Sequence, residues 1–308
     1  MAVSLVTGGA GFIGSHLVEH LVEKGHRVRV VDDLSTGHLW RLDRIRDRID
    51  LIQADLSTAP LDPIVADAER VFHLAAVPSV SRSVRDPLLS HGSIATATLR
   101  LLAALKESGA TIVISSSSSV YGETAASPKS EDLPTRPISP YAVAKLAAEG
   151  YGRVFSELFG LRVVMLRYFN VFGPRQDPDS PYAAVIPIFI RRALRGEPLP
   201  IHGDGGQTRD FTYVENVVEA NMSAAAARLD GPRVYNIAAG SPQSLLDLVR
   251  ALETILGRDL EVHHGPPRTG DIRHSAADIT RAALELGWRP RIGFLEGLRR
   301  TAEWYRER

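Results

Sequence analysis

Short runs of aliphatic and β-branched residues alternate with amphipathic stretches over the first half of the chain. The runs lie at residues 3–6, 28–31, 51–53, 71–74, 111–114 and 163–166, and they predict strands. Apolar residues recur at helical spacing over 13–24, 88–106 and 141–159. Strands that alternate with helices form parallel sheets, because each strand returns through a helical crossover. The pattern therefore predicts an α/β fold with a doubly wound parallel sheet.

The pattern changes after residue 172. Residues 173–181 are rich in Pro and Asp and show no periodicity. Beyond them we predict helices near 185–195, 214–227, 244–256, 279–286 and 294–305, and a strand at 234–237. We expect the larger domain to cover residues 1–171 plus about 213–238, and a smaller α/β domain to cover about 172–212 plus 239–308. The Pro- and Ser-rich stretch 122–139 is either a solvated loop or a wall of a cleft.

A glycine-rich turn joins the first predicted strand to the first predicted helix. Gly8, Gly11 and Gly14 recur every third residue in it. The first glycine permits the tight bend, the second lets a pyrophosphate approach the backbone, and the third lets the helix pack closely on the sheet. The helix start adds free amides and a positive dipole. The turn predicts a dinucleotide site in a Rossmann-type sheet, although a non-binding α/β protein can also contain such a turn.

Asp32 ends the second predicted strand, where an acid can bind the adenosine ribose hydroxyls of a dinucleotide. A carboxylate there repels a 2′-phosphate, so the sequence favours NAD over NADP. Residues 55–56 follow the third strand and would border the adenine. The small residues at 74–76 end the fourth strand and would let the backbone approach the cofactor.

Tyr141 and Lys145 are spaced to lie on one face of a helix. Ser139 suits its N-cap and Pro140 its first turn, so Tyr141 should lie at the carboxyl edge of the sheet, where ligands bind. Ser117 follows the fifth strand and reaches the same edge. We predict that Tyr141 is a general base whose pKa the Lys145 ammonium lowers, that Lys145 also binds the cofactor ribose, and that Ser117 bonds to the substrate hydroxyl. The alternative is a buried tyrosine with a lysine that merely reaches the surface.

Composition narrows the class of protein. The 308 residues include 36 basic and 36 acidic side chains, a balance that argues against a nucleic acid or an anionic membrane as partner. The sequence has no cysteine, which excludes disulfides, thiolate catalysis and cysteine-bound zinc, and we predict no metal site. We expect no apolar run as long as a membrane span. The chain enters a strand pattern at once, so we expect no signal peptide and a cytoplasmic location.

These motifs resemble the extended short-chain dehydrogenase/reductase superfamily, and within it the UDP-sugar 4-epimerases, over nearly the whole chain. The matching segments are residues 7–14, 32–37, 73–76, 115–122, 139–145, 167–174, 203–205 and 207–211. The resemblance implies NAD as cofactor and a UDP-sugar as substrate. It also implies a homodimer in which the helices near 88–106 and 141–159 form a four-helix bundle.

The resemblance also implies the binding residues. The cofactor would contact Gly8, Gly11, Phe12, Ile13, Asp32, Asp33, Ser35, Thr36, Gly37, Asp55, Leu56, Leu74, Ala75, Ala76, Ser115, Tyr141, Lys145, Tyr168 and Val171. The substrate would contact Ser79, Ser117, Ser118, Asn170, Val185, Phe189, Arg192, His202, Gln207, Arg209, Arg268, Asp271 and Ser275. Asn170 would hold the diphosphate, and Arg209 and Arg268 would clamp its charge. Asp271 would contact the ribose, and residues 184–189 with His202 would enclose the uracil.

The residues after Ser117 bear on the reaction. Dehydratases and decarboxylases of this superfamily carry carboxylates there, whereas this chain has Ser118 and Ser119. A 4-keto sugar formed here should therefore be reduced again, which is epimerisation at C4. A decarboxylase, a net NAD-linked dehydrogenase and a non-catalytic NAD-sensing protein remain alternatives.

The sugar is not determined by these motifs. Ser275 is small where related enzymes can carry a bulky gate, which resembles epimerases that accept N-acetylhexosamines, as does the segment from Ser79 to Ser83. A uronic acid would need a cation, for which Arg82, Arg191 and Arg192 are candidates. One position departs from the family: Ile94 stands where an asparagine is usual.

Overall fold

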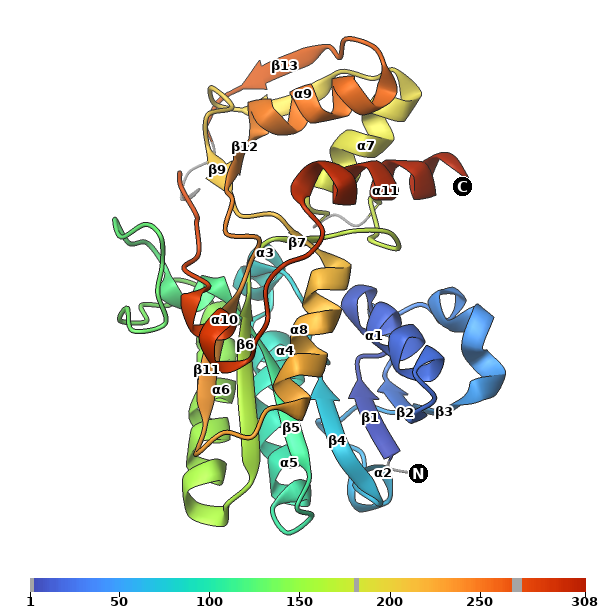
Figure 1. Cartoon of the computed structure of the whole chain (residues 1–308), viewed down its shortest axis with the longest axis vertical. Coiled ribbons are helices and arrows are strands. Elements are labelled where there is room, and N and C mark those ends of the chain that lie inside the picture. The colour runs from blue at the N-terminus through green and yellow to red at the C-terminus, as the bar shows by residue number, and fades with distance from the viewer. Residues whose placement is uncertain (1–2, 180–182, 268–272) are drawn as a thin grey trace.

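The large sheet is parallel, as the alternating pattern predicts. The computed structural model describes residues 3–179, 183–267 and 273–308. Seven strands pair in the order β11-β6-β5-β4-β1-β2-β3 (Figure 1). Their bounds are β1 Val3–Thr7, β2 Arg27–Asp32, β3 Ile49–Gln53, β4 Ala68–His73, β5 Thr111–Ser117, β6 Arg162–Tyr168 and β11 Arg233–Ile237. The doubly wound fold class is thereby confirmed.

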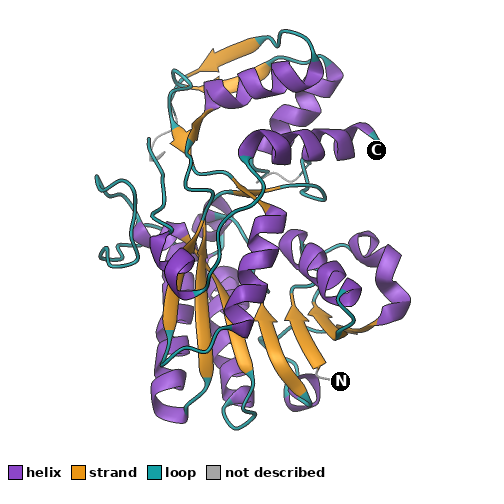
Figure 2. Ribbon diagram, in the orientation of Figure 1, coloured by secondary structure: helices purple, strands orange, loops and turns teal. Residues whose placement is uncertain are grey.

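Helices cover both faces of this sheet (Figure 2). On one face, α1 (Phe12–Glu23) and α8 (Val214–Ala226) contribute Leu17 and Val217 to the same apolar core. On the other, α5 (Ala97–Leu105) and α6 (Pro140–Phe159) bury Leu101 and Ala148 in a second core. Each layer of helices therefore buries one face of the sheet. The carboxyl edge of the strands is not covered by these layers, and a ligand site can form there.

Shorter helices lie between the strands, and three of them were not predicted. These are a 3-10 helix, Leu39–Arg48, after β2, α2, Asp62–Val65, before β4, and α3, Val80–Arg85, after β4. The helix expected over 88–106 is present as a contiguous helical stretch made of α4 Pro87–Ser90, a π-helical segment His91–Thr96, and α5. Ser79 and Asp86 accept hydrogen bonds from amides at the starts of α3 and α4, so the separation of these two helices is encoded in the sequence.

One expectation about apolar runs is wrong. Pro87–Leu105 is a helical stretch of 19 residues that is long and apolar enough to cross a bilayer by length and composition alone. In the described structure, part of its apolar surface is used inside the protein, because Ile94, Leu101 and Leu105 belong to the core beneath α6.

The smaller unit lies beyond the carboxyl edge of the sheet (Figure 1). It contains α7 Val185–Arg195, α9 Leu245–Leu256 and α11 Phe294–Arg306, and the parallel pair β8 Leu199–His202 and β13 Val262–Gly265. Short pairs join it to the rest: β7 Val171–Phe172 with β10 Thr212–Tyr213, and β9 Thr208–Arg209 with β12 Gln243–Ser244. The helix α10, Thr280–Glu285, packs back beside β11, and a 3-10 turn, Ser118–Tyr121, follows β5.

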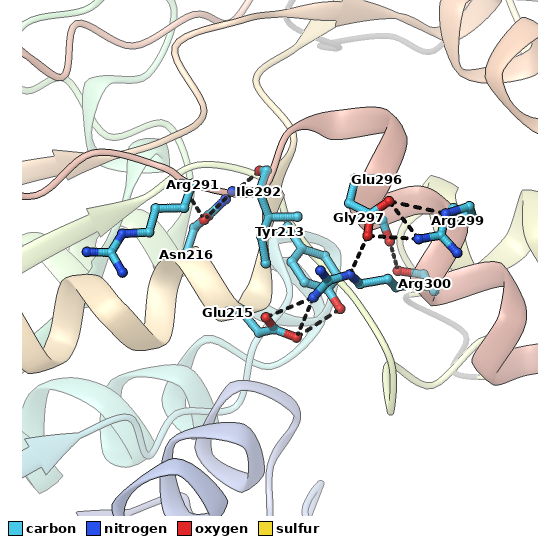
Figure 3. A network of polar contacts seen from close by, with 10 residues as sticks. Tyr213, Glu215, Asn216, Arg291, Ile292, Glu296, Gly297, Arg299 and Arg300 are labelled. Carbon is cyan, nitrogen blue, oxygen red and sulfur yellow. Dashed lines mark hydrogen bonds and ion pairs between the residues drawn. The ribbon is translucent and has the colours of Figure 1, made fainter. Parts of the chain in front are cut away.

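A polar junction holds α11 against the start of α8 (Figure 3). The Asn216 side chain donates to the carbonyl of Ile292 at 2.8 Å and accepts from the amide of Arg291 at 2.9 Å. Gly297 packs so closely on the Tyr213 ring that a Cβ there would lie 2.7 Å from a ring carbon. The smaller unit is thus joined to the large sheet by specific contacts. The domain boundaries drawn from the sequence stay a prediction.

Candidate active site

The glycine turn has the geometry that dinucleotide binding requires. Gly8 has φ +70°, and a Cβ on it would lie 2.7 Å from the Ala75 amide nitrogen. A Cβ on Gly14 would lie 2.1 Å from the Gly8 carbonyl oxygen. Side chains at these two positions would therefore separate α1 from the turn or block the approach of the β4 loop. The bare backbone and the free amides at the start of α1 form a cradle that suits a pyrophosphate.

Asp32 is oriented by backbone amides at the end of β2. Its carboxylate accepts from the Ala10 amide and the Leu34 amide, both at 2.9 Å. A Cβ on Gly37 would lie 2.5 Å from an Asp32 oxygen, so a side chain at position 37 would displace the acid, and Gly37 itself is not among the residues that line the cleft. Burial raises the pKa of Asp32, while the hydrogen bonds from the two backbone amides oppose that rise.

A cleft of about 810 Å³ runs along the carboxyl edge of the sheet from Asp32 to Tyr141. The predicted cofactor residues lining it are Gly8, Gly11, Phe12, Ile13, Asp32, Asp33, Ser35, Thr36, Asp55, Leu56, Leu74, Ala75, Ala76, Ser115, Tyr141, Lys145, Tyr168 and Val171. Ser79, predicted for the substrate, lines it too. The glycine cradle, the oriented acid and the length of the cleft fit NAD.

Tyr141 and Lys145 enter the cleft from the first turns of α6. The Ser139 hydroxyl accepts from the Ala142 amide at 3.2 Å, and Pro140 occupies the first turn, as predicted. The Lys145 ammonium donates to the carbonyl of Ser115 at 2.7 Å and to its hydroxyl at 3.1 Å. Strand β5 thereby fixes the Lys145 cation one helical turn from Tyr141, and both side chains line the cleft.

The predicted lowering of the Tyr141 pKa is wrong for the chain as described. Burial raises the pKa of Tyr141, and a hydrogen bond with the Ser117 side chain only partly opposes this. Burial also lowers the pKa of Lys145 to about 8, although the Glu149 carboxylate acts in the opposite direction. Bound NAD would add the positive charge of the nicotinamide ring.

Several side chains in the cleft were not predicted from the motifs. They are His38, Arg41, Val77, Pro78, Ser93, Ser116, Gln176 and Asp177. Ser116 belongs to the serine run and could have been included. Its hydroxyl donates to Glu149 at 2.5 Å, and Arg167 holds the same carboxylate in two hydrogen bonds. Arg41 carries no motif, since its place depends on contacts with the carbonyls of Ala10 and Arg175.

The π-helical stretch explains the departure at Ile94. The wider turn directs Ile94 into the core, where it is 1% exposed, and Ser93 lines the cleft. The Ser93 hydroxyl accepts from the Val77 amide at 3.4 Å. A polar group is therefore present at this part of the cleft, one residue earlier than the family pattern suggests.

Most predicted substrate residues lie outside the lining of this cleft, around the junction with the smaller unit. They are Ser117, Ser118, Asn170, Val185, Phe189, Arg192, His202, Gln207, Arg209 and Ser275. Ser117 accepts from the Ser119 amide at 3.2 Å, and Asn170 is exposed at the end of β6 with φ +27°. Arg268 and Asp271 lie outside the described residues.

The observed packing bears on two of these predictions. Phe189 is 1% exposed in the core of the smaller unit, because α7 directs its apolar face inward, and it presents no surface for uracil. Arg192 donates to the carbonyl of Pro198 at 2.7 Å at the end of α7. Of the three arginines considered for a uronic acid, only Arg82 lines the cleft.

The fold and the cleft define an NAD-binding enzyme whose cleft contains Tyr141 and Lys145. A family model, the NAD dependent epimerase/dehydratase family, matches residues 4–238. The chain is 40% identical to the UDP-glucose 4-epimerase of Mycolicibacterium smegmatis, with 99% of each chain covered.

Solved structures agree with this match. A UDP-N-acetylglucosamine 4-epimerase from Methanobrevibacter ruminantium superposes with a TM-score of 0.95 and 41% identity, covering 99% of this chain and 98% of the other. The UDP-glucuronic acid 4-epimerase of Bacillus cereus, solved with UDP-glucuronic acid and NAD, gives a TM-score of 0.90 and 32% identity, with 99% of each chain covered. The chain therefore belongs to the NAD-dependent epimerase/dehydratase family. The predicted resemblance to UDP-sugar 4-epimerases, and NAD as the cofactor, are confirmed.

Proposed function

We propose that this chain catalyses NAD-dependent epimerisation at C4 of a UDP-hexose derivative. The observation that carries this proposal is the convergence of Tyr141, Lys145 and the Ser115 end of β5 on a cleft that also contains Asp32 and the glycine turn. A phenol at the nicotinamide end of such a cleft can remove a proton from a sugar hydroxyl while hydride leaves the same carbon.

Three side chains share the chemistry. Tyr141 takes the proton of the C4 hydroxyl, and Ser117 supports that hydroxyl by a hydrogen bond. Lys145, fixed by Ser115, stabilises the phenolate that Tyr141 needs and binds the cofactor ribose. NAD held by the residues of the cleft would supply a reversible acceptor for the hydride of C4. Because the returning hydride must reach the opposite face of C4, the 4-keto sugar has to rotate while its UDP part stays bound.

The polar surroundings of Ser117 favour return of the hydride over elimination. Residues 115–119 are all serine, so the run supplies no carboxylate for removing a second proton. Glu149 lies beneath the run, but Ser116 and the Nε and Nη2 groups of Arg167 already donate hydrogen bonds to it. A buried carboxylate engaged in this way is a poor general base.

The substrate within this class is a further proposal. Arg82 and the small Ser275 leave a glucose, an N-acetylhexosamine and a uronic acid as UDP-sugars to compare. The test is to incubate purified protein separately with UDP-glucose, UDP-N-acetylglucosamine and UDP-glucuronate, and to resolve the C4 epimers by chromatography. We expect an epimer from at least one substrate and none from Tyr141→Phe. A 6-deoxy-4-keto product, released carbon dioxide or accumulating NADH would contradict the proposal.

We also propose a homodimer located in the cytoplasm. Large apolar side chains are exposed on α4 and α6, which lie in the two segments that the family resemblance assigns to a bundle, and on α3, which precedes α4. They are Val80, Val84, Leu88, Val143, Val154, Leu158 and Phe159. An apolar face of this kind is the usual mark of a surface that another chain covers.

A further inference from the structure

An aromatic stack joins α11 of the smaller unit to the 3-10 helix Leu39–Arg48 of the larger one. The rings of Trp40 and Trp304 stack with their centroids 6.1 Å apart and their planes at 25°. The Arg308 guanidinium lies over both rings, 4.7 Å from the centroid of Trp40 and 4.6 Å from that of Trp304. His38 stacks on Trp40 as well, at 6.4 Å. The two units therefore meet at an aromatic contact that lies outside the catalytic centre.

The residues on either side of Trp40 line the NAD cleft. They are His38 and Arg41. The His38 amide donates to the carbonyl of Ala10 at 3.0 Å, and the Arg41 guanidinium donates to the same carbonyl at 3.2 Å. Ala10 belongs to the glycine-rich turn between β1 and α1. The stack therefore holds a segment of the cleft wall that lies directly beside the pyrophosphate cradle.

The residue after Trp304 holds a second segment of the cleft wall. The Tyr305 hydroxyl donates to the carbonyl of Gln176, and the side chains of Gln176 and Asp177 line the cleft. Both belong to residues 173–179, which follow β7 and which we call the strap. Helix α11 therefore contacts both segments of the wall, one through Trp304 and the other through Tyr305.

The two segments are also tied directly to each other. Arg41 Nε donates to the carbonyl of Arg175 at 3.1 Å, and Arg175 Nη1 donates to the carbonyl of Arg41 at 3.4 Å. Arg175 has φ +69°, a left-handed conformation that is unfavourable for a residue with a Cβ. It also pairs with Glu19 of α1. The strap is thus held in a strained conformation by contacts from α1, the 3-10 helix and α11.

We propose that the Trp40–Trp304 stack is a latch that keeps the strap closed over bound NAD. A dinucleotide in the cleft would lie between the segment His38–Arg41 and the strap, and it would leave on this side only when the two separate. Epimerisation returns its hydride to the sugar, so the cofactor needs no exchange between turnovers. A latch that slows NAD release suits such a reaction. Its location depends on NAD binding alone, and its use rests on the proposed function.

The first test measures how fast bound NAD exchanges for labelled NAD in the purified holoenzyme. Trp304→Ala removes the stack and one of the two rings beneath Arg308, so we expect exchange to be at least about tenfold faster, which corresponds to about 1.4 kcal/mol. Trp304→Phe keeps an aromatic face and should recover part of this change. Leu295→Ala shortens a side chain that is 51% exposed on the same helix and should exchange NAD as wild type does.

UDP binding, measured by calorimetry, separates a latch from a contact that only supports the smaller unit. A latch leaves the UDP affinity of Trp304→Ala unchanged. Faster NAD exchange accompanied by an equal loss of UDP affinity would report general loosening of the smaller unit and would overturn the inference. Wild-type exchange rates in Trp304→Ala would overturn it too, whatever happens to the melting temperature.

Crosslinking supplies the opposite perturbation. The sequence has no cysteine, so combining Trp40→Cys with Trp304→Cys introduces two thiols that react without competition. Before crosslinking, this double variant should exchange NAD at least as fast as Trp304→Ala. After a short bismaleimide joins the two thiols with NAD bound, we expect exchange to slow at least about tenfold.

Unchanged exchange in fully crosslinked protein, verified by mass spectrometry, would mean that NAD leaves by another route and would overturn the latch. The proposed function fails separately from the latch. If no UDP-sugar is epimerised although the exchange rates change as expected, only the proposed function is contradicted.

Discussion

The Lys145 ammonium is held by Ser115, at 2.7 Å from its carbonyl oxygen and 3.1 Å from its hydroxyl oxygen. The carbonyl belongs to the backbone of β5, so most of this anchoring does not depend on a side chain. The cation that we propose stabilises the Tyr141 phenolate is thereby fixed by the same strand that ends in Ser117.

We expect Lys145→Met to lower kcat about 100-fold or more, because the phenolate of Tyr141 loses its neighbouring cation. Ser115→Ala removes only the hydroxyl acceptor and should lower kcat less than tenfold, since each hydrogen bond contributes about 1 kcal/mol. The pKa of Lys145 is about 8, so the charge is present below that pH and lost above it. Initial rates should therefore fall as pH rises past about 8. Equal losses in the two variants would contradict this assignment.

Asp32→Asn should weaken NAD binding about tenfold and improve NADP binding. The change removes the negative charge that repels a 2′-phosphate but keeps a group of similar shape between Ala10 and Leu34. Titration calorimetry with each nucleotide measures both effects. Asp43→Asn, on the exposed face of the 3-10 helix Leu39–Arg48, is the matched control and should bind both nucleotides as wild type does. An unchanged NAD affinity in Asp32→Asn would contradict the ribose role.

Stability should fall in mild acid because of His73. Its ring contacts the hydroxyls of Thr7 at 2.7 Å and Thr98 at 2.9 Å in the interior, and burial lowers its pKa from 6.5 to about 3. Between these values the unfolded chain binds the extra proton and the folded chain does not. The free energy of unfolding is therefore lost as pH falls below 6.5, by up to about 1.4 kcal/mol per pH unit from this group.

Denaturant unfolding at pH 7.5, 6.5 and 5.5 measures this slope. His73→Gln is expected to be less stable at every pH, but its slope should be flatter than that of wild type. His91→Gln changes an exposed histidine and should keep the wild-type slope. Burial also lowers the pKa of His16, to about 4, so part of the slope should remain in His73→Gln. Parallel slopes in wild type and His73→Gln would exclude His73 as a source of the pH dependence of the free energy of unfolding.

Leu158→Glu should convert the proposed dimer into a monomer. Leu158 is 71% exposed near the end of α6, and a carboxylate there would have to leave water at an apolar interface. Sedimentation velocity measures the change in mass. Leu284→Glu, on a residue 76% exposed on α10, is the control and should leave the mass unchanged. A monomeric wild type would contradict the proposal directly.

The parts of the fold that depend on neighbours in sequence could be predicted. The start of α6 is an example, since Ser139 and Pro140 carry the capping chemistry themselves. The order of strands follows from alternating strands and helices. The separate helix α3 was missed because its N-cap, Ser79, and the N-cap of α4, Asp86, were weighed less than the apolar run that follows them.

The parts of the site that depend on burial could not be predicted in the same way. Periodicity places Phe189 on the apolar face of α7 but does not say whether that face meets a ligand or the core. The pKa of Tyr141 depends on how far its phenol is removed from water, which no spacing records. Trp40 and Trp304 carry no motif, and their contact joins segments that lie far apart along the chain.

The edge strand β11 limits which segments can be exchanged between enzymes of this fold when chimeras are built. It pairs with β6 only after the chain has built much of the smaller unit and has returned through α8. A gene fragment ending at residue 171 would lack this strand and would lose Val217 and Tyr235 from the core. Chimeras that borrow a new sugar-recognition unit from a relative therefore need two replaced segments, one on each side of β11. A single crossover would leave a sheet with an open edge and a cavity beneath it.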